Sequence, residues 1–418
     1  MSRCVIVGSG AREHALAWAI AKSADVVVTP GNAGIAAHGI ACVITPATEL
    51  DADLFVVGPE APLVAGLADV LRAQGKTVVG PGAAGALLEG SKAFMKEFFA
   101  SAGIPTAAYG SFRDEASAFS FLSTMKPPYV IKTDGLAAGK GVLVTEDLEE
   151  ARRDVATKLS GAAFGEAGTT VVIEEGLIGE ECSFHVLCDG TETVGLAPSQ
   201  DFKRVGNYDQ GANTGGMGAY APMTNMSDEQ ISDIMRDIIE PTTRELVRRG
   251  IDFRGVLYAG VMLTPEGPKL LEYNVRFGDP ETEVLVPLYG DQLFDVLMRV
   301  GEGRLEGATF RPSGAAVTVV VASEGYPQHP RIGDVIDGLG PDGQLADGDG
   351  YVVVFHAGTS RDAEGNFVTN GGRVLAVTGL GDNLVDARRR AYEGATLITF
   401  RGSVRRSDIA LAATEGDQ

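Results

Sequence analysis

Residues 271–282 read LEYNVRFGDPET, and the apolar stretch 255–264 just before them is typical of a β-strand. Turn residues separate the two stretches, so the sequence predicts a β-hairpin whose second strand is Lys269–Asn274. Side chains two apart on a strand share a face. One face is therefore predicted to carry Glu272, Asn274 and Arg276. The opposite face is predicted to pack into the core through Leu271, Tyr273 and Val275.

The polar row on this strand suits one kind of chemistry. A carboxylate and an amide oxygen are hard ligands of the kind that hold Mg²⁺, and a guanidinium group forks onto a carboxylate or a phosphate. The row therefore predicts a metal site beside a negatively charged reacting group. On local grounds alone, an edge strand with a solvated polar face is an equally good interpretation.

Length and composition limit the classes of protein that fit. With 418 residues, the chain is expected to form about two to four domains. A formal charge of −21 argues against nucleic acid or an anionic membrane surface as a partner. No apolar run approaches the roughly 20 residues of a membrane span, and we expect no signal peptide. The four cysteines lack CxxC spacing, which predicts reduced thiols in a cytoplasmic protein.

Strand-like and helix-like segments alternate in the first hundred residues. Strands are predicted at 4–7, 26–29, 54–57 and 77–79. A single amphipathic helix ending at Gly75 is predicted from one apolar face, which is Leu63, Leu67, Val70 and Leu71. The alternation indicates an open parallel sheet that binds ligands at the carboxyl ends of its strands. The loops 31–34 and 58–60 lie at that edge.

The turn after the first strand, Gly8–His14, nearly matches the dinucleotide-binding fingerprint. Glu13 stands where the third glycine belongs, and no acidic residue clearly ends a second strand about 20 residues further on. A nicotinamide cofactor is therefore disfavoured. Free amides at a helix N-terminus still attract phosphate, and Arg12 adds positive charge.

Lysines flank a glycine-rich segment in the middle of the chain. Ser91 opens a predicted helix, Lys92–Ala102, whose first-turn lysine is explained by a bound anion or by solvent exposure. A strand ending at Lys132 runs into the segment 133–142, which predicts a hairpin whose loop can cover a polyphosphate, with Lys140 as a second charge. The spacing is not that of a Walker A loop.

Several further segments carry weaker signals. The strand Val171–Glu175 ends in two acids. Backbone groups at such a strand exit can read an adenine edge, but a hairpin with solvated acids is equally consistent. Strands at 182–188 and 193–197 are predicted to complete an antiparallel sheet. Segment 199–220 has almost no hydrophobic pattern and is predicted to be a long binding loop. Ser227 with Gln230 predicts a capping box at the start of a helix that Gly250 ends.

Three separated elements now agree: lysines before and on a glycine-rich hairpin, an acidic strand exit, and Glu-x-Asn-x-Arg on a late strand. Together they resemble the ATP-grasp ligases, and the match is closer still to the phosphoribosylamine–glycine ligase family of purine biosynthesis. The motifs run essentially end to end: 8–16, 30–34, 57–63, 89–94, 134–142, 213–220, 274–282 and 322–327. Those at 213–220 and 274–282 are specific to this family. Two departures are Ala11, where the family usually has Gly, and Gly176, where it usually has an aromatic residue.

The resemblance implies a multidomain chain of α/β and α+β architecture. Residues 1–102 would form an N-terminal parallel α/β domain, the pre-ATP-grasp domain, and residues 103–313 the ATP-grasp core. A mobile ATP lid would cover about 114–190, and residues 314–418 would form a small closing α+β domain without catalytic residues. We expect a cytoplasmic monomer whose partners are small molecules, without nucleic acid or membrane.

The resemblance also implies the reaction. ATP would drive ligation of glycine to 5-phosphoribosylamine, giving glycinamide ribonucleotide, ADP and phosphate through glycyl phosphate. The cofactors would be ATP and Mg²⁺ or Mn²⁺, with the metal ion held by Glu272 and Asn274. Arg276 would neutralise charge on the transferred phosphoryl group, and Asp201 with the 213–218 loop would bind the glycine ammonium group.

The site residues that the resemblance implies fall into three groups. Those implied in catalysis are Arg276, Asp201 and Lys132. Those implied in nucleotide binding are Lys92, Lys132, Gly135, Gly139, Lys140, Gly141, Glu174, Glu175, Leu177 and Glu181. Those implied in substrate binding are Gly10, Arg12, Glu13, Asn32, Ala33, Gly58, Pro59, Glu60, Asp201, Asn213, Thr214, Gly215, Gly216, Met217, Arg276, Gly278 and Asp279.

Three alternatives compete with this interpretation. Another ATP-grasp enzyme, such as a purine-pathway carboxylase, would use the same nucleotide site on a different acid, although segment 213–220 counts against it. A nucleotide-binding regulatory module without turnover is disfavoured by the intact polar row and both lysines. A nicotinamide-dependent oxidoreductase would require the first turn to bind NAD.

Overall fold

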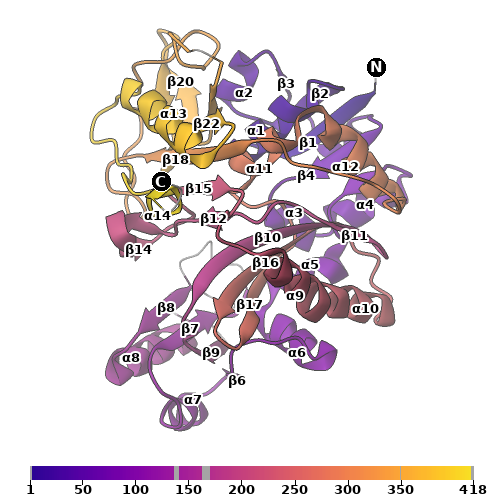
Figure 1. Ribbon diagram of the computed structural model, residues 1–418, viewed down its shortest axis with the longest axis vertical. Coiled ribbons are helices and arrows are strands. Elements are labelled where there is room, and N and C mark those ends of the chain that lie inside the picture. Colours follow the sequence, from indigo (N-terminus) through magenta and orange to yellow (C-terminus); the bar gives the residue numbers. More distant parts are fainter. Residues whose placement is uncertain (1, 136–140, 162–169, 349, 416–418) are drawn as a thin grey trace.

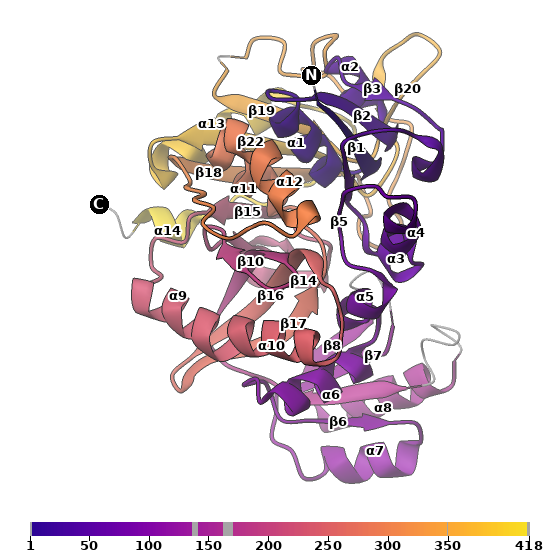
Figure 2. The same cartoon turned by 90° about the vertical axis from the view of Figure 1, so that its right-hand side faces the viewer.

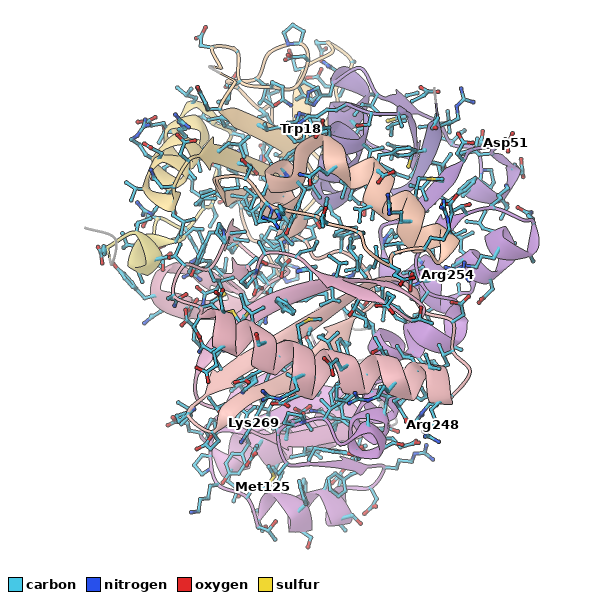
Figure 3. The ribbon with its side chains drawn as sticks, turned by 45° about the vertical axis from the view of Figure 1, so that its right-hand side comes forward. Trp18, Asp51, Met125, Arg248, Arg254 and Lys269 are labelled. Carbon is cyan, nitrogen blue, oxygen red and sulfur yellow. The ribbon has the colours of Figure 1, made fainter. Side chains whose placement is uncertain are left out.

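The computed structural model describes residues 2–135, 141–161, 170–348 and 350–415, which form three regions along the long axis of the molecule (Figure 1). The N-terminal and C-terminal regions lie side by side at one end, a small sheet lies at the other, and a central sheet lies between them (Figures 1 and 2). In Figure 3, Met125, Lys269 and Trp18 mark the small sheet, the central sheet and the N-terminal region in that order. Among the helices of this described part, none is long and apolar enough to span a membrane.

The N-terminal region is built on a five-stranded parallel sheet of order β3-β2-β1-β4-β5. Its strands are β1 Arg3–Gly8, β2 Asp25–Pro30, β3 Ala41–Cys42, β4 Leu54–Val57 and β5 Val78–Val79. The predicted open parallel sheet is confirmed, although β3 was not predicted. Helices α1 (Ala11–Ile20) and α2 (Ala33–Ala37) begin just after β1 and β2. Their N-termini therefore lie at the carboxyl edge of the sheet.

The helix predicted to end at Gly75 is wrong as a single element. Gly66 adopts a left-handed conformation, with φ of 83°, and separates α3 (Glu60–Val64) from α4 (Leu67–Ala73). The break turns Val70 outward, so 48% of it is exposed. Two further helices, α5 (Ala83–Gly90) and α6 (Lys92–Ala102), lead into the middle of the chain. The bounds of α6 are those predicted, because Ser91 accepts a hydrogen bond from Phe94 N at 3.1 Å and caps the helix.

The small sheet has order β6-β9-β7-β8 and is antiparallel throughout. Its strands are β6 Tyr109–Phe112, β7 Tyr129–Thr133, β8 Val142–Thr145 and β9 Val171–Glu175. Helices α7 (Glu115–Leu122) and α8 (Leu148–Leu159) bury Leu122 and Val155 against it. The predicted hairpin around the glycine-rich segment is therefore confirmed for its two strands.

The central sheet has order β11-β10-β16-β17 and is also antiparallel. Its strands are β10 Glu180–Asp189, β11 Thr193–Gly195, β16 Arg254–Thr264 and β17 Gly267–Asn274. The hairpin predicted at the end of this sheet is confirmed. However, β10 and β11 join β16 here and not the acidic strand β9.

One face of the central sheet is covered by a long helical segment. It comprises α9 (Asp228–Ile234), a π-helical stretch (Met235–Ile239) and α10 (Glu240–Arg248). The predicted capping box of Ser227 and Gln230 is present at its start. Thr242 on α10 bonds the hydroxyl of Tyr273 at 2.7 Å, which fixes this as the face opposite the polar row.

A β-bulge alters the predicted alternation on β17. Gly260 pairs with Glu272, but Val261 pairs with Leu270, so Leu271 is an extra residue without a partner in register. Leu270 is fully buried and Leu271 only half-buried. The prediction that Leu271 packs in the core is therefore wrong, because one inserted residue shifts the side chains before it to the other face.

A third sheet, of order β12-β15-β18-β22-β19, joins the middle of the chain to its C-terminal third. Its strands are β12 Gln200–Asp201, β15 Gly218–Ala221, β18 Ala315–Ala322, β19 Val352–His356 and β22 Arg373–Gly381. Between β12 and β15, the strands β13 (Arg204–Gly206) and β14 (Gln210–Asn213) form a small hairpin. The structureless loop predicted at 199–220 is therefore wrong.

The remaining elements complete the C-terminal half. Helices α11 (Thr282–Tyr289) and α12 (Leu293–Glu302) follow the polar row, and α13 (Leu384–Leu397) follows β22 and contacts it. Strands β20 (Thr359–Arg361) and β21 (Phe367–Thr369) form a hairpin, and α14 (Leu411–Glu415) lies near the end of the described residues.

Candidate active site

Five polar side chains project from the same face of the central sheet, because residues directly opposite one another on antiparallel strands share a face. One row across the sheet is Ser183, Gly260 and Glu272, and the next is His185, Tyr258 and Asn274. Gly260 has no side chain, so the carboxylate of Glu272 has free space over the middle strand. The predicted polar row is therefore part of a wider polar face.

Lysine charges from neighbouring elements converge on Glu272. Burial alone would raise the pKa of this carboxyl, but the charges of Lys132 on β7 and Lys203 after β12 outweigh it and keep the pKa below its usual range. Glu272 is therefore ionised. Asn274 Oδ1 accepts a hydrogen bond from Arg276 Nη2 at 3.2 Å. An anionic carboxylate beside an amide oxygen is a donor set that fits Mg²⁺ completed by phosphate oxygens.

Lys132 belongs to a buried ionic triad. Glu174 on β9 pairs with Lys96 on α6 at 2.8 Å and with Lys132 at 2.9 Å. Burial opposes the charge of Glu174, but the two lysines outweigh it and lower its pKa. Burial also opposes the charge of Lys132, yet Glu174 and Glu272 raise its pKa. The triad thus holds a permanent positive charge beside Glu272, and the carboxylate expected to frame adenine is committed to lysines.

The start of the glycine-rich loop is fastened to α6. Asp134 Oδ1 accepts hydrogen bonds from Ser91 Oγ at 3.1 Å and from Ala93 N at 3.2 Å, and Lys92 Nζ donates to Gly135 O at 3.4 Å. At the far end of the loop, Thr133 N donates to Gly141 O at 2.9 Å. Two predicted nucleotide-binding residues, Gly139 and Lys140, lie outside the described residues.

The remaining residues predicted to bind the nucleotide lie along the exit of β9. Glu175 accepts a hydrogen bond from Ala108 N at 3.0 Å, and Leu177 is half-buried. Glu181 shares the polar face of β10 with Ser183 and accepts a hydrogen bond from Lys203 Nζ. At Gly176, a Cβ atom would collide with the ring of Pro128 and lie 2.7 Å from its carbonyl oxygen. That contact explains why this chain has no aromatic side chain there.

Asp201 lies beside Lys203 at the edge of the polar face. Its Oδ1 is 3.4 Å from Ser183 Oγ and 3.9 Å from Lys203 Nζ, and its side chain is only 7% exposed. Burial raises the pKa of Asp201 to about 7, although Lys203 opposes this. A nearly buried carboxylate that Lys203 approaches only to 3.9 Å can accept an ammonium group.

Side chains of the C-terminal region bind the segment 213–218. Arg373 on β22 donates from Nη1 to Gly215 O at 2.5 Å and to Asp279 O at 2.9 Å, and its Nη2 pairs with Asp279 Oδ1 at 3.1 Å. Tyr326 OH accepts from Gly215 N at 3.0 Å. The predicted substrate residues at 213–217 and 278–279 are thus brought together by a residue that sequence reasoning missed. It comes from a region in which no catalytic residues were expected.

Arg276 is surrounded by acidic groups from the N-terminal region. Its guanidinium pairs with Glu89 Oε1 at 2.9 Å and with Glu60 Oε2 at 3.3 Å. Burial opposes its charge, but these two carboxylates raise the pKa of Arg276 above its usual range. The pairs connect the polar row to the loop 58–60, as the expected substrate site requires.

The first glycine turn is filled by Glu13. Its carboxylate accepts hydrogen bonds from Gly10 N at 2.6 Å and from Arg12 Nε at 2.6 Å. A Cβ atom on Gly8 or Gly58 would collide with this carboxylate. The amide of Gly10, a residue predicted to bind substrate, is therefore already bonded to the side chain of Glu13.

Other contacts place the N-terminal loops beside the polar row. Arg12 Nη1 donates to Phe277 O at 3.2 Å, and the space beside Gly10 is bounded by Asp279. Asn32 caps α2 by accepting from Gly34 N and Ile35 N, each at 2.9 Å, and its amide donates to Ser9 O at 2.8 Å. The structure thus gathers residues around 10, 32 and 58 next to Arg276 and Asp279, with Ala33 and Pro59 at the starts of α2 and α3.

Comparison with known proteins agrees with this geometry. Models of phosphoribosylglycinamide synthetase match the chain with the N domain at residues 2–89, the ATP-grasp (A) domain at 90–282 and the C domain at 316–412. The phosphoribosylamine–glycine ligase of Mesorhizobium japonicum is 47% identical, covering 98% of each chain. The crystal structure of phosphoribosylamine–glycine ligase from Thermotoga maritima matches with a TM-score of 0.86 and 36% identity, covering 98% of this chain and 100% of that one. The chain belongs to the phosphoribosylamine–glycine ligase family.

Membership of the phosphoribosylamine–glycine ligase family confirms the predicted α/β multidomain fold and makes the chain an ATP-grasp ligase of purine biosynthesis. It also favours this ligase over the carboxylase and oxidoreductase alternatives. The fold itself is shared more widely. The biotin carboxylase domain of Hydrogenobacter thermophilus 2-oxoglutarate carboxylase, solved with MgADP and bicarbonate, matches with a TM-score of 0.72 and 18% identity. It covers 97% of this chain and 92% of that one, and at this identity the likeness shows the fold alone.

Several charged or polar residues of this phosphoribosylamine–glycine ligase were not predicted to serve its site. Lys96 had one usable signal, since a spacing of four from Lys92 places both on one face of α6. Lys203 follows Asp201 by two residues, which on a strand would put them on one side. For the others no local pattern exists, because strand pairing and the position of α11 bring them together: Ser183, Tyr258, Glu281 and Arg373.

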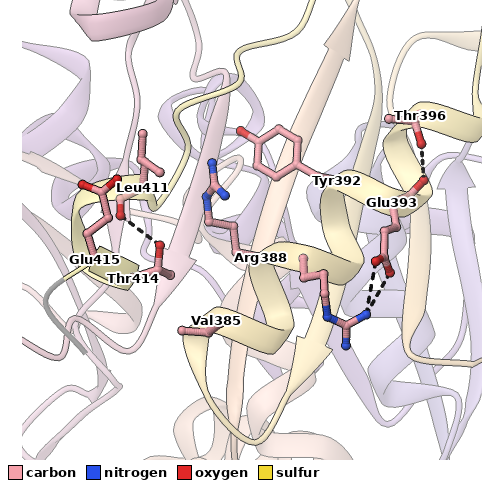
Figure 4. A pocket seen from close by; sticks show the side chains of 9 residues that line it. Val385, Arg388, Tyr392, Glu393, Thr396, Leu411, Thr414 and Glu415 are labelled. Atoms are coloured by element: carbon pink, nitrogen blue, oxygen red, sulfur yellow. Dashed lines mark hydrogen bonds and ion pairs between the residues drawn. The ribbon is translucent and has the colours of Figure 1, made fainter. Parts of the chain in front are cut away.

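The ligase also has a pocket away from this polar face. A pocket of about 550 Å³ lies between α13 and α14 (Figure 4). Its Arg389 pairs with Glu393 at 3.0 Å, and Arg388 donates to Ile409 O at 2.9 Å and Ser407 O at 2.8 Å. These two arginines are therefore already bonded within their own chain. Within the described ranges no group of three or more His, Cys, Asp or Glu side chains is arranged to hold a metal ion.

Proposed function

We propose that the polar face of the central sheet joins glycine to 5-phosphoribosylamine with ATP, giving glycinamide ribonucleotide, ADP and phosphate through glycyl phosphate. The observation that carries this proposal is the convergence on one face of Glu272, Asn274 and Asp201 with lysines of the neighbouring elements. Phosphoryl transfer needs positioning and charge neutralisation more than covalent help from the protein. This face supplies both.

The nucleotide would lie between the small and central sheets. Lys132 and Lys92 would contact its phosphates, the loop from Gly135 to Gly141 would cover them, and Glu181 would hold the ribose. Glu272 and Asn274 would hold Mg²⁺ or Mn²⁺, which would supply positive charge to offset that of the phosphates. The ionised state of Glu272 supports this role. Lys132 keeps its proton because Glu174 and Glu272 stabilise its charge.

Glycine would lie between Arg276 and Asp201. Arg276 would orient the glycine carboxylate, one oxygen of which attacks the γ-phosphorus of ATP as the bond to ADP breaks. Asp201 would hold the ammonium group, which its near burial and its 3.9 Å distance from Lys203 support. The segment 213–218, fastened by Arg373, would keep water from the mixed anhydride.

5-Phosphoribosylamine would enter from the N-terminal loops. Residues 10–13, 32–33 and 58–60 lie at the carboxyl edge of the parallel sheet, next to Arg276 and Asp279. The amine attacks the carbonyl carbon of glycyl phosphate and phosphate leaves. Because Glu13 already occupies the amide of Gly10, Glu13 would orient the turn while Asn32 and the helix starts face the substrate.

The reaction is tested by measuring ADP release with ATP and Mg²⁺, with and without glycine and freshly generated 5-phosphoribosylamine. We expect release that needs both substrates and is matched by glycinamide ribonucleotide. Release that needs bicarbonate in place of glycine would overturn the acceptor. If no ADP is released in any mixture, the proposed ligase reaction itself is overturned.

The metal site is tested with Glu272→Gln, which keeps the size of the side chain and removes its charge. We expect the Mg²⁺ concentration for half-maximal activity to rise about tenfold or more, because one anionic ligand is lost. Glu266→Gln is the matched control, since Glu266 is an exposed acid in the turn of the same hairpin. An unchanged Mg²⁺ requirement in Glu272→Gln would contradict the assignment.

We also propose that the chain acts as a cytoplasmic monomer. Its four cysteines are free thiols, as is typical of a reducing compartment. A mass near 43.6 kDa by light scattering, unchanged by substrates, is the expected result. A dimer mass at working concentration would contradict it.

A further inference from the structure

A buried hydrogen-bonded cluster stands behind Asp201. Ser183 Oγ lies 3.0 Å from Tyr258 OH, 3.2 Å from Glu281 Oε1 and 3.4 Å from Asp201 Oδ1. Tyr258 OH donates to Glu281 Oε1 at 2.5 Å. Ser183, Tyr258 and Glu281 are each 6% exposed or less. They come from three elements, β10, β16 and the N-terminus of α11, so the cluster exists only in the folded chain.

The cluster has fewer protons than acceptors. Each of its two hydroxyl groups has one proton to donate. Tyr258 gives its proton to Glu281, and Ser183 can give its own to only one of the three oxygens around it. Two carboxylates therefore face each other across Ser183 with too few donors between them. A group with several N–H donors and a positive charge would complete the site.

We propose that Tyr258 and Ser183 are positioning residues that hold Glu281 and Asp201 as a pair of carboxylates around the ammonium group of glycine. The inference rests on the proposed placement of glycine at Asp201 and deepens it into a basis for substrate choice. Two close carboxylates repel one another, and a cation removes that repulsion whereas a neutral hydroxyl does not. The pair thus selects an amino acid over a hydroxy acid of the same size.

Tyr258 can be tested without removing its packing role. Its ring stacks on His185, with centroids 4.2 Å apart and planes at 21°. Tyr258→Phe keeps this stack and removes only the hydroxyl. Tyr273→Phe is the matched control, because Tyr273 lies on the opposite face of the same hairpin and bonds Thr242 through its hydroxyl at 2.7 Å. Both changes remove one buried hydroxyl from a paired strand.

The experiment compares glycine with glycolate, which carries a hydroxyl in place of the ammonium group. For each variant, the KM for glycine, the KM for ATP and the inhibition constant of glycolate against glycine are measured on the full-length enzyme. In Glu281→Gln and Tyr258→Phe we expect the KM for glycine to rise roughly ten- to a hundredfold, the effect of losing a hydrogen bond to a charged group. The KM for ATP and the glycolate constant should change by less than about threefold.

Each outcome has a fixed meaning. If Tyr258→Phe and Glu281→Gln weaken glycine and glycolate equally, or no more than Tyr273→Phe does, the role is structural and the inference is overturned. If Asp201→Asn leaves the KM for glycine unchanged, the proposed placement of glycine fails first. If Asp201→Asn raises it while the cluster variants do not, only the inference fails. If the Glu281→Gln variant does not fold, Ser183→Ala provides a second test of the inference.

Discussion

Asp201 is the residue whose protonation is poised nearest to physiological pH. Burial raises its pKa to about 7, against an ordinary value of 3.8. The free enzyme therefore holds Asp201 partly protonated at neutral pH. Since only the carboxylate attracts an ammonium group, the kcat/KM for glycine should rise with pH through a midpoint near 7. This dependence is a property of the free enzyme, which is the state that kcat/KM reports.

The pH profile is checked by measuring kcat/KM for glycine from about pH 6 to pH 8.5, spanning that ionisation. The Asp201→Asn variant should have a lower kcat/KM for glycine at every pH, and its kcat/KM should no longer rise near pH 7. Asp209→Asn, which changes an exposed acid of the neighbouring hairpin, should keep it. A wild-type profile that is flat across this range would contradict the assignment of Asp201.

Lys96 is the second residue whose chemistry leads to a prediction. It is fully buried, pairs with Glu174 at 2.8 Å and donates to Thr106 Oγ1 at 2.9 Å. Removing one partner of a buried ionic network leaves an uncompensated charge, so Lys96→Met should lower the free energy of unfolding by about 3 kcal/mol. Urea denaturation measures this loss. Lys269→Met, on the rim of β17, should lose less than about 1 kcal/mol, as is usual for surface ion pairs.

At the scale of elements, the sequence predicted most accurately where the signal is local. Ser91 fixes the start of α6, Ser227 with Gln230 fixes the start of α9, and a turn fixes the hairpin of β16 and β17. Predictions failed where one residue changes the geometry, as at the bulge of Leu271 and the left-handed Gly66. The strands of 200–221 are only two to four residues long, too short to show an alternating pattern.

The residues of the candidate site also differ in whether a local sequence pattern could predict them. The polar row of β17 could be predicted because alternation on one strand is a property of neighbouring residues. Tyr258, Ser183 and Glu281 could not, because their meeting depends on the register of β10 against β16 and on the position of α11. Arg373 reaches the site only through the pairing of β22 with β18.

The turn after β1 yields a prediction at this scale. A Cβ atom on Gly58 would collide with the carboxylate of Glu13, which caps Gly10. Gly58→Ala should therefore displace Glu13, lower the free energy of unfolding by about 1–3 kcal/mol and raise the KM for 5-phosphoribosylamine. Gly348→Ala, in an exposed loop where a Cβ atom meets only ordinary contacts, is the control. Equal effects of the two changes would contradict the packing argument.

At the scale of the whole molecule, three histidines join the N-terminal and C-terminal regions. His14 Nε2 lies 3.1 Å from His38 Nδ1, and His356 N donates to His14 Nδ1 at 2.9 Å. Burial lowers the pKa of His356 to about 4 and that of His14 well below its usual value. Both histidines are therefore neutral in the folded enzyme at neutral pH, and the contact between the regions depends on this state.

Acid should weaken that contact. As pH falls below 6.5, His356 becomes protonated in the unfolded chain but stays neutral in the folded chain. The stability present above pH 6.5 is therefore lost as pH falls toward 4. By pH 5 the loss from His356 alone should be about 2 kcal/mol. Urea denaturation at pH 7 and pH 5 measures it. His356→Gln should show a smaller difference between the two, whereas the exposed His329→Gln should match the wild type.

The sheet that joins the middle of the chain to its C-terminal third sets an order of assembly during synthesis. The strands that would face the nucleotide in the proposed function, β7, β9, β10, β16 and β17, have all left the ribosome once residue 274 has emerged. The strands β12 and β15, which carry Asp201 and end the 213–218 segment, gain their neighbour only when residues 315–322 follow, and Arg373 comes later still. On the proposed placement of the two substrates, the strands on the nucleotide side would be complete before those on the glycine side, which would be finished last.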